Sequence, residues 1–308
     1  AEISWTEPWF LDRPMALTVE LYRRMRWYDE YDEIRTGGAV GLSYPVKVGR
    51  VGARYTLELV QMDDVDDGYW YVNDNDVNAS TDDLGLDENR VMPTQYFKDQ
   101  EDAYGDALNS VIRLYWAHDT RDKPFVPTRG YQATVFGEAS EGGIGDNEYY
   151  KLGVNYRRWF RMPWYHHVLS LRGRFETVDA YSGDLPIYEK LFLGGPRTIR
   201  GVEYRDLGPK VYSASGDHAP IGGQTMALVS AEYTVPVFKA VRLAGFVDIG
   251  SLGEDAFDPE LSNVCVSAGV GVRIDIPGFP IRFDFAKPMV EDDSYTDEEI
   301  FSFAIGFE

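Results

Sequence analysis

Apolar and polar residues alternate along much of this 308-residue chain. In the stretch YKLGVNYRRW (150–159), Leu152, Val154 and Tyr156 fall on one face of an extended strand, and charged or amide side chains fall on the other. The same period of two recurs in VLSLRGRFE, VRLAGFVDI, IRFDF and FSFAIGF. Helical periodicity is poor in every window of about a dozen residues. The pattern therefore predicts an all-β chain.

The alternation predicts an antiparallel sheet with connections of two kinds. The predicted strands lie at 1–7, 17–28, 34–44, 51–62, 109–119, 129–138, 149–161, 166–176, 224–234, 241–249, 264–274, 281–286 and 300–307. Every second link is short, whereas most of the others are longer, and the longest are 63–108 and 177–223. Short turns at one end and long loops at the other are typical of outer-membrane barrels.

The two faces of these strands differ in charge. One face is apolar, whereas the other carries full charges of both signs in mid-strand, for example Arg172 and Arg174. Alternation alone does not say which face is outside. Aromatic residues gather at the strand ends, which favours a membrane barrel over ordinary aromatic strand ends in a soluble sandwich. They are Trp9, Phe10, Trp27, Tyr28, Tyr44, Trp159, Phe160, Trp164 and Tyr165. We therefore expect a transmembrane antiparallel barrel with its charged face inward.

The composition narrows the classes of function. A formal net charge of -21 and a pI near 4.5 make nucleic-acid binding unlikely, because such a chain repels phosphate backbones. Cys265 is the only cysteine, which excludes an internal disulfide, and we expect it to be a small buried hydrophobe. No apolar run approaches 18 residues, so no transmembrane helix is predicted.

No metal or catalytic motif stands out. In the acidic segment between residues 63 and 106, Asp74, Asp76 and Asn78 imitate the start of a calcium loop. The positions that need glycine and glutamate hold Ala79 and Gly85, so an EF-hand is excluded and a solvated external loop is expected.

Catalysis has equally little support. The chain carries no nucleophile elbow, zincin pair, phosphate loop or dinucleotide fingerprint. The adjacent His166 and His167 would point to opposite sides of a strand, which is a poor geometry for a shared metal ion. We therefore expect a protein that is not an enzyme and needs no cofactor.

The stretch LFLGGPRTIRGVEYRDLGP (191–209) is too rich in glycine and proline for a strand or a helix. A plain surface turn is one interpretation, and a folded lid whose arginines dock onto another part of the molecule is the other. The ordered set Gly194, Gly195, Arg200, Gly201, Gly208 and Pro209 resembles the signature loop of the outer-membrane assembly superfamily, in the form found in its BamA family. Further similar segments are TEPWFLDRP, HDTRDKPFVPTRGY, SAEYTVP, AGFVDIG and FSFAIGF, so the resemblance spans the chain.

The resemblance implies an architecture. Residues 1–308 would be the C-terminal part of a sixteen-stranded barrel, preceded by three strands and several periplasmic POTRA domains. The loop 177–223 would fold into the lumen, where Arg200 docks on acidic groups of the inner wall. On the strands predicted above, Asp248 and Glu232 lie on the charged face. Both are candidate partners of Arg200. Glu232 lies nearer the short-turn end and Asp248 nearer the long-loop end, so Asp248 is the preferred partner if one arginine does not reach both.

The resemblance also implies a function. Family members fold and insert other barrel proteins into the bacterial outer membrane through a lateral gate between the first and last strands. Here Phe301, Phe303, Ile305 and Phe307 would form the closing strand. The implied partners are nascent outer-membrane proteins, accessory lipoproteins, and lipopolysaccharide or phospholipid. Two alternatives remain open, namely a protein-translocating barrel (TamA-like or a two-partner secretion pore) and a passive porin or binding barrel.

Overall fold

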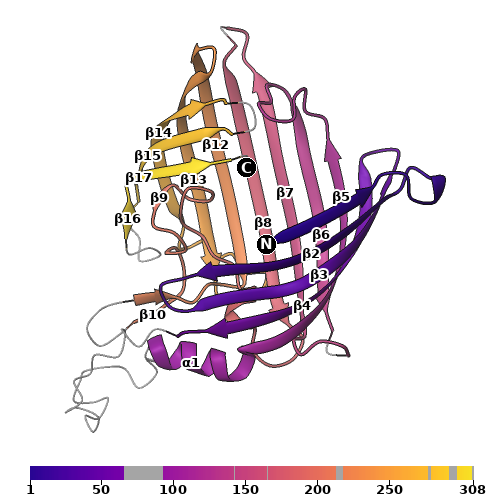
Figure 1. Ribbon diagram of the computed structural model, residues 1–308. Helices are drawn as coiled ribbons and strands as arrows, with labels where there is room; N and C mark the ends of the chain where they lie inside the picture. The colour runs from indigo at the N-terminus through magenta and orange to yellow at the C-terminus, as the bar shows by residue number, and fades with distance from the viewer. Residues whose placement is uncertain are drawn as a thin grey trace, which may run out of the picture.

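The computed structural model describes residues 1–65, 93–141, 143–164, 166–212, 218–276, 279–290 and 297–306 (Figure 1). Thirteen antiparallel strands form one sheet, paired in chain order, which confirms the predicted strand number and sequence. The strands are β1 (Glu2–Glu7), β2 (Ala16–Trp27), β3 (Asp32–Pro45), β4 (Arg50–Asp63), β5 (Asp106–Asp119), β6 (Gly130–Ser140), β7 (Tyr149–Arg161), β8 (Val168–Ala180), β12 (Thr225–Phe238), β13 (Val241–Gly253), β14 (Cys265–Ile274), β15 (Ile281–Pro288) and β17 (Phe301–Ile305). β1 and β17 are the two edges of this sheet.

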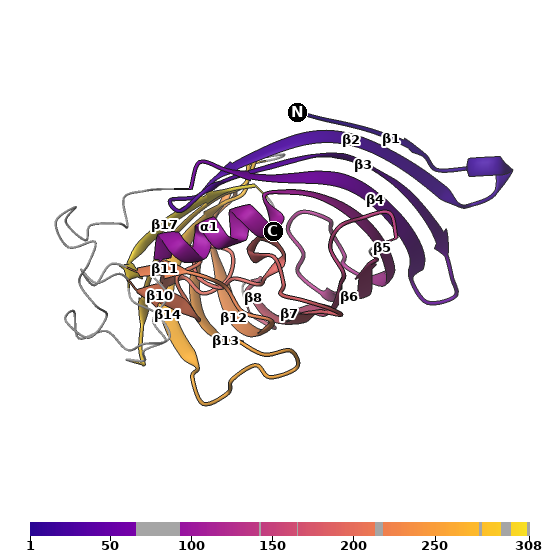
Figure 2. The same ribbon diagram turned by 90° about the horizontal axis from the view of Figure 1, so that it is seen from below.

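The sheet curves around an interior that holds the segment between β8 and β12 (Figure 2). The alternating side chains sort as expected. Leu152, Val154 and Tyr156 are each more than 40% exposed on the outer face. On the inner face Arg172 Nη1 donates a hydrogen bond to the carbonyl oxygen of Arg197, which lies in the interior segment. The apolar face is therefore outside and the charged face inside.

The inner face is less uniformly charged than the sequence suggests. Toward the long-loop end, aliphatic side chains of the wall and of the interior segment form one buried cluster, which includes Met226, Leu228 and Cys265. The interior segment contributes Leu185, Leu191, Leu193, Ile199, Val202 and Leu207 to it. Because these side chains pack together, the interior segment is held by apolar burial as well as by charges.

Outside the sheet lie short elements. They are the 3₁₀ turns η1 (Phe10–Asp12) and η3 (Ile187–Glu189), the helix α1 (Pro93–Tyr104), and the short strands β9 (Gly201–Val202), β10 (Lys210–Tyr212), β11 (His218–Pro220) and β16 (Glu298–Glu299). The sequence did not predict α1. Its composition is strongly polar and it buries few side chains, of which Phe97 packs beside Tyr31 and Ile187. No helix of the described residues is long and apolar enough to cross a membrane.

Most of the strand-end aromatic residues that the structure describes point away from the interior. Trp9, Trp27 and Trp164 are all more than half exposed. Trp159 and Tyr28 are exceptions. Trp159 is 8% exposed and lines an interior cavity, whereas Tyr28 is partly buried and its ring packs against Arg205 of the interior segment. Trp159 shares the inward face of β7 with Lys151, which is eight residues away along the strand. Tyr165 and the calcium-like positions Asp74, Asp76 and Asn78 lie outside the described residues.

Candidate functional site: a lid anchored in the lumen

The link between β8 and β12 runs from residue 181 to residue 224 and is called the lid below. Its motif glycines adopt backbone angles that other residues rarely take. The φ values are +113° for Gly194, +90° for Gly195, +92° for Gly201 and +112° for Gly208. A Cβ at Gly194 would overlap the carbonyl oxygen of Glu203, and one at Gly208 would lie 2.6 Å from Leu252 Cδ2. These glycines therefore allow the lid to fold tightly and to approach the wall.

The remaining motif residues complete this fold. Thr198 Oγ1 donates to the carbonyl oxygen of Gly194 at 2.7 Å and accepts from its N–H at 2.9 Å. The carbonyl oxygen of Pro209 accepts a hydrogen bond from the Ile221 N–H at 3.0 Å. The lid is thus a structured unit that presents Arg200 from a tight turn.

Arg200 contacts two carboxylates of the wall. Its Nε and Nη2 donate to Asp248 Oδ2 and Oδ1 at 2.7 and 2.8 Å, and its Nη1 donates to Glu232 Oε2 at 2.8 Å. Asp248 is fully buried and Arg200 is 5% exposed. Burial alone would lower the pKa of Arg200, but the hydrogen bonds and charge of Asp248 raise it above its ordinary value. The guanidinium is therefore a permanent cation paired with both acids.

Arg200 reaches both candidate carboxylates, not the preferred Asp248 alone. β12 continues to Phe238 and β13 to Gly253, so Glu232 and Asp248 both lie well inside their strands. The register pairs Ser230 with Asp248, which makes Glu232 a diagonal neighbour of Asp248 on the same face. The fork of Arg200 spans this diagonal.

The contacts of Arg200 with Asp248 and Glu232 are called the clamp below. The clamp continues along the wall as a row of alternating charges. Arg273 donates to Glu232 Oε2 at 2.7 Å and to Asp284 Oδ1 at 2.6 Å. The chain of charges therefore crosses four neighbouring strands, from β12 to β15. Under the clamp, Phe246 presents its ring to Arg200, whose Cζ lies 3.4 Å from the ring centroid. Burying these charges removes their hydration, and the ion pairs offset this cost only when their hydrogen-bond geometry is good.

The lid has a second ionic anchor, which was not predicted from the sequence. Glu189, in the lid, accepts hydrogen bonds from Arg35 Nη1 at 3.1 Å and from Lys151 Nζ at 3.3 Å. Arg35 Nη2 also donates to the carbonyl oxygen of Tyr188. Burial would raise the pKa of Glu189, but the charges of Lys151 and Arg35 outweigh burial and lower it. The only sequence signal was an inward arginine and lysine on two predicted strands.

Arg205 forms a third attachment, of a different kind. Its guanidinium lies between the rings of Phe192 and Tyr28, with Cζ 3.5 and 4.0 Å from the two centroids. Tyr28 belongs to the turn between β2 and β3, opposite the strands that hold Arg200. The lid is therefore fixed to both sides of the sheet.

The lid also pairs with the segment that precedes the last strand. Gly201 and Val202, which form β9, pair antiparallel with Glu299 and Glu298, which form β16. β17 begins two residues after β16, and its Phe301, Phe303 and Ile305 face outward with 41–48% exposure. Phe307 lies outside the described residues. The lid motif and the last strand are thus directly connected.

The described residues contain no group of three or more His, Cys, Asp or Glu side chains placed to hold a metal ion. His167 Nδ1 lies 2.7 Å from the Tyr233 hydroxyl, whereas His166 contacts Arg161. The two rings therefore have separate partners. The contacts described at this site are ion pairs, hydrogen bonds and apolar packing that hold the folded lid in the lumen.

The curved antiparallel sheet and the lid anchored inside it by ion pairs place this chain in the class of β-barrel proteins with a loop inserted into the lumen. The whole chain, residues 1–308, matches the Omp85 superfamily domain. The chain belongs to the Omp85 superfamily.

Similar proteins come from several organisms. The chain is 28% identical, over 94% of its length, to the outer membrane protein assembly factor BamA of Nitratidesulfovibrio vulgaris, and it covers 33% of that protein. It is 33% identical to BamA of Neisseria meningitidis serogroup B, over 44% of the chain and 18% of that protein. It is 26% identical to a SAM50-like protein of Drosophila melanogaster, over 67% of the chain and 47% of that protein. The chain thus spans about a third or less of these BamA proteins.

Solved structures confirm the barrel fold. BamA from Haemophilus ducreyi lacking POTRA domains 1–3 superposes with a TM-score of 0.73 at 21% identity, covering 98% of this chain and 60% of that chain. CdiB from Acinetobacter baumannii superposes with a TM-score of 0.56 at 12% identity, covering 99% of this chain and 49% of that chain. At these identities the likeness concerns the fold alone.

Proposed function

We propose that this chain forms the barrel wall and the lid of a protein that folds other β-barrel proteins and inserts them into the bacterial outer membrane. The observation that carries the proposal is the continuity between the clamp and the last strand. Arg200 is held by Asp248 and Glu232, and the next two residues pair with the segment just before β17. The state of the lid is thereby linked to the position of a sheet edge.

An edge strand offers unpaired N–H and C=O groups to an incoming strand. β17 is such an edge in the described sheet, because β15 is its sole neighbour. In the proposed mechanism, the lid holds β17 in place as one side of a lateral gate. A substrate strand then adds to the edge by backbone hydrogen bonds, without covalent chemistry or nucleotide.

The outer face supports an outer-membrane location. Its large apolar side chains are exposed on successive strands, for example Leu243, Val247 and Ile249 on β13. Burying such a face in hydrocarbon is favourable, whereas exposing it to water is not. The proposed partners are nascent outer-membrane proteins, accessory lipoproteins, and lipopolysaccharide or phospholipid around the barrel. The names of the BamA relatives agree with this assignment.

The test uses the natural full-length protein reconstituted in liposomes, with an unfolded barrel protein as substrate. Arg200→Ala and Asp248→Ala should each lower the yield of folded substrate at least about tenfold, since removing one partner of a buried pair typically costs about 3–5 kcal/mol. Arg50→Ala is the matched control, because Arg50 is exposed on β4, away from the clamp, and donates a hydrogen bond to Ser43 Oγ on β3. Normal assembly by both clamp variants would contradict the proposed role.

Two alternatives predict different results. A protein-translocating barrel would move an exoprotein across the bilayer in the same liposomes and leave barrel proteins unfolded. A passive porin would show a steady open pore in planar bilayers and would not need Arg200. The lid argues against the porin, because its apolar side chains pack against the wall inside the lumen.

A further inference from the structure

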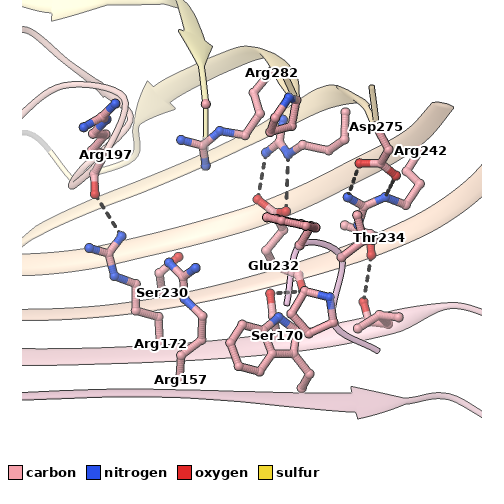
Figure 3. A pocket seen from close by; sticks show the side chains of 18 of the residues that line it. Arg157, Ser170, Arg172, Arg197, Ser230, Glu232, Thr234, Arg242, Asp275 and Arg282 are labelled. Atoms are coloured by element: carbon pink, nitrogen blue, oxygen red, sulfur yellow. Dashed lines mark hydrogen bonds and ion pairs between the residues drawn. The ribbon is translucent and has the colours of Figure 1, made fainter. Parts of the chain in front are cut away.

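Between the lid and the short-turn end, the lumen contains a partly open cavity of about 150 Å³ (Figure 3). Its lining comes from the lid around residues 196–200, from the turn at 124–127, and from the inner faces of β7, β8, β12, β13, β14 and β15. This volume accommodates a phosphate group with several water molecules. The clamp forms one side of the cavity, and the arginines that face it elsewhere take no part in that clamp.

The charge of this lining is opposite to that of the whole chain. Eight arginines line the cavity, against two carboxylates, Glu232 and Asp275. Asp119, Asp248 and Asp284 contact lining arginines from outside the lining, so that among the residues the structure describes eight positive charges meet five negative ones in these contacts and the lining. The chain as a whole carries a formal charge of -21. Because low-dielectric walls focus the field of such a cluster, the cavity concentrates anions.

Four of the eight lining arginines have carboxylate partners at 2.6–2.8 Å, namely Arg121, Arg200, Arg242 and Arg273. Arg172 donates a hydrogen bond to the carbonyl oxygen of Arg197. Arg157 and Arg172 approach from β7 and β8, and Arg282 approaches from β15, so that the three guanidinium groups face a common space (Figure 3).

Hydroxyl groups complete the lining. Ser170, Thr198 and Thr234 all border the cavity and can donate hydrogen bonds to an anion. Guanidinium forks match the paired oxygens of phosphate, and each fork supplies two parallel donors. The combination of several arginines from opposite walls with hydroxyl donors suits a phosphate ester better than a single carboxylate.

We propose that this cavity is a binding site for a phosphate-bearing anion, held between Arg157 and Arg172 on one wall and Arg282 on the other. The phosphate is that of a soluble phosphate compound or that of an anionic lipid headgroup. The three arginines that would hold the anion are not those of the clamp, which forms another side of the cavity, so the binding test does not depend on the assembly function proposed above.

The experiment uses the full-length protein in an uncharged detergent, with pyrophosphate as the probe and calorimetric titration as the measurement. The wild-type protein should bind pyrophosphate, and raising the salt concentration should weaken binding because screening reduces the attraction. A variant carrying Arg157→Gln and Arg172→Gln should lose at least about tenfold in affinity, since it removes two guanidinium groups that form charge-assisted hydrogen bonds to phosphate. Arg282→Gln, on the opposite wall, should independently give a loss in the same direction.

Arg113→Gln is the matched control, because Arg113 faces the lumen and pairs with Glu138 at 2.6 Å outside the cavity. Native mass spectrometry of protein from phosphatidylglycerol nanodiscs provides the second arm. Loss of pyrophosphate binding alone identifies a soluble phosphate, and loss of retained phosphatidylglycerol in the same variants identifies a headgroup. If neither ligand distinguishes these variants from the wild type and from Arg113→Gln, the proposed site does not exist.

Discussion

Gly269 leaves the space that the ring of Phe246 occupies. The two residues are directly opposite each other on β14 and β13, and a Cβ at position 269 would lie 2.5 Å from Phe246 Cζ. The same ring lies under the guanidinium of Arg200. The absence of a side chain at Gly269 thus leaves room for the ring of Phe246, against which the guanidinium of Arg200 packs.

Gly269→Ala should destabilise the barrel by about 1–3 kcal/mol, because an added methyl group would overlap both the ring and the carbonyl oxygen of Phe285. The measurement is the free energy of unfolding in detergent, followed by circular dichroism in urea. Gly245→Ala is the control, since a Cβ there meets no atom within 4 Å, and its effect should stay within about 0.5 kcal/mol. Equal effects of the two substitutions would contradict the packing argument.

Glu189→Gln should loosen the first part of the lid. The substitution leaves the inward cations Arg35 and Lys151 without their shared anion, although Arg35 keeps Glu33 and Glu58. We expect a cost of about 1–3 kcal/mol, and faster tryptic cleavage after Lys190 and Arg197.

A second substitution checks the cause. Adding Lys151→Met to Glu189→Gln removes one of the two stranded cations, so part of the protease resistance should return. Unchanged cleavage in Glu189→Gln would mean that apolar packing alone holds this part of the lid.

Gly201→Ala should release the segment before the last strand. At φ +92° an alanine is strained, and its Cβ would lie 3.0 Å from the carbonyl carbon of Ala286. Because Gly201 pairs with Glu299, hydrogen exchange across residues 297–305 should accelerate at least about fivefold, as measured by mass spectrometry.

Gly183→Ala controls for backbone strain in this experiment. Gly183 also has a positive φ, of +73°, but a Cβ there meets no atom within 4 Å. Exchange across 297–305 should not change in this variant. Acceleration by Gly183→Ala as large as that by Gly201→Ala would rule out a local link between the lid and β17.

The strands were predictable because their period of two is a local property of the sequence. The pairing of Glu189 with Arg35 was not, because 154 positions separate them and no local pattern reports a distance across a lumen. The contact of Arg200 with Asp248 could be expected from the inward face of β13 together with the family resemblance. Its reach to Glu232 depended on the register of β12 against β13, which a sequence alone does not fix. Helix α1 lacks a strong apolar stripe and was not predictable from the sequence. In the structure its Phe97 packs against residues that are distant in the sequence.

Asp122 should make the turn between β5 and β6 sensitive to acid. Slight burial opposes ionisation, but the N–H groups of Thr128 and Arg129 and the Thr128 hydroxyl donate to the carboxylate and lower its pKa to about 2. A folded-state pKa below the ordinary 3.8 means that the carboxylate stabilises the fold above pH 3.8 and loses this effect as the pH falls toward 2.

The comparison is between the wild type and Asp122→Asn. The wild type should have the higher melting temperature at pH 6, and the difference should shrink toward zero near pH 2. Thr128→Val removes one donor to the carboxylate and should reduce the difference in part. A difference that stays constant between pH 6 and pH 2 would show that the ionisation of Asp122 does not contribute.

The two ionic anchors of the lid carry opposite signs. Glu189 brings a negative charge to the cations Arg35 and Lys151, whereas Arg200 brings a positive charge to the anions Glu232 and Asp248. A lid threaded into the lumen back to front would meet like charges at both ends, which repel strongly in a poorly hydrated interior. The signs of the charges at the two anchors thus select one orientation of the inserted lid. Exchanging the signs at one anchor alone should prevent the lid from docking in either orientation.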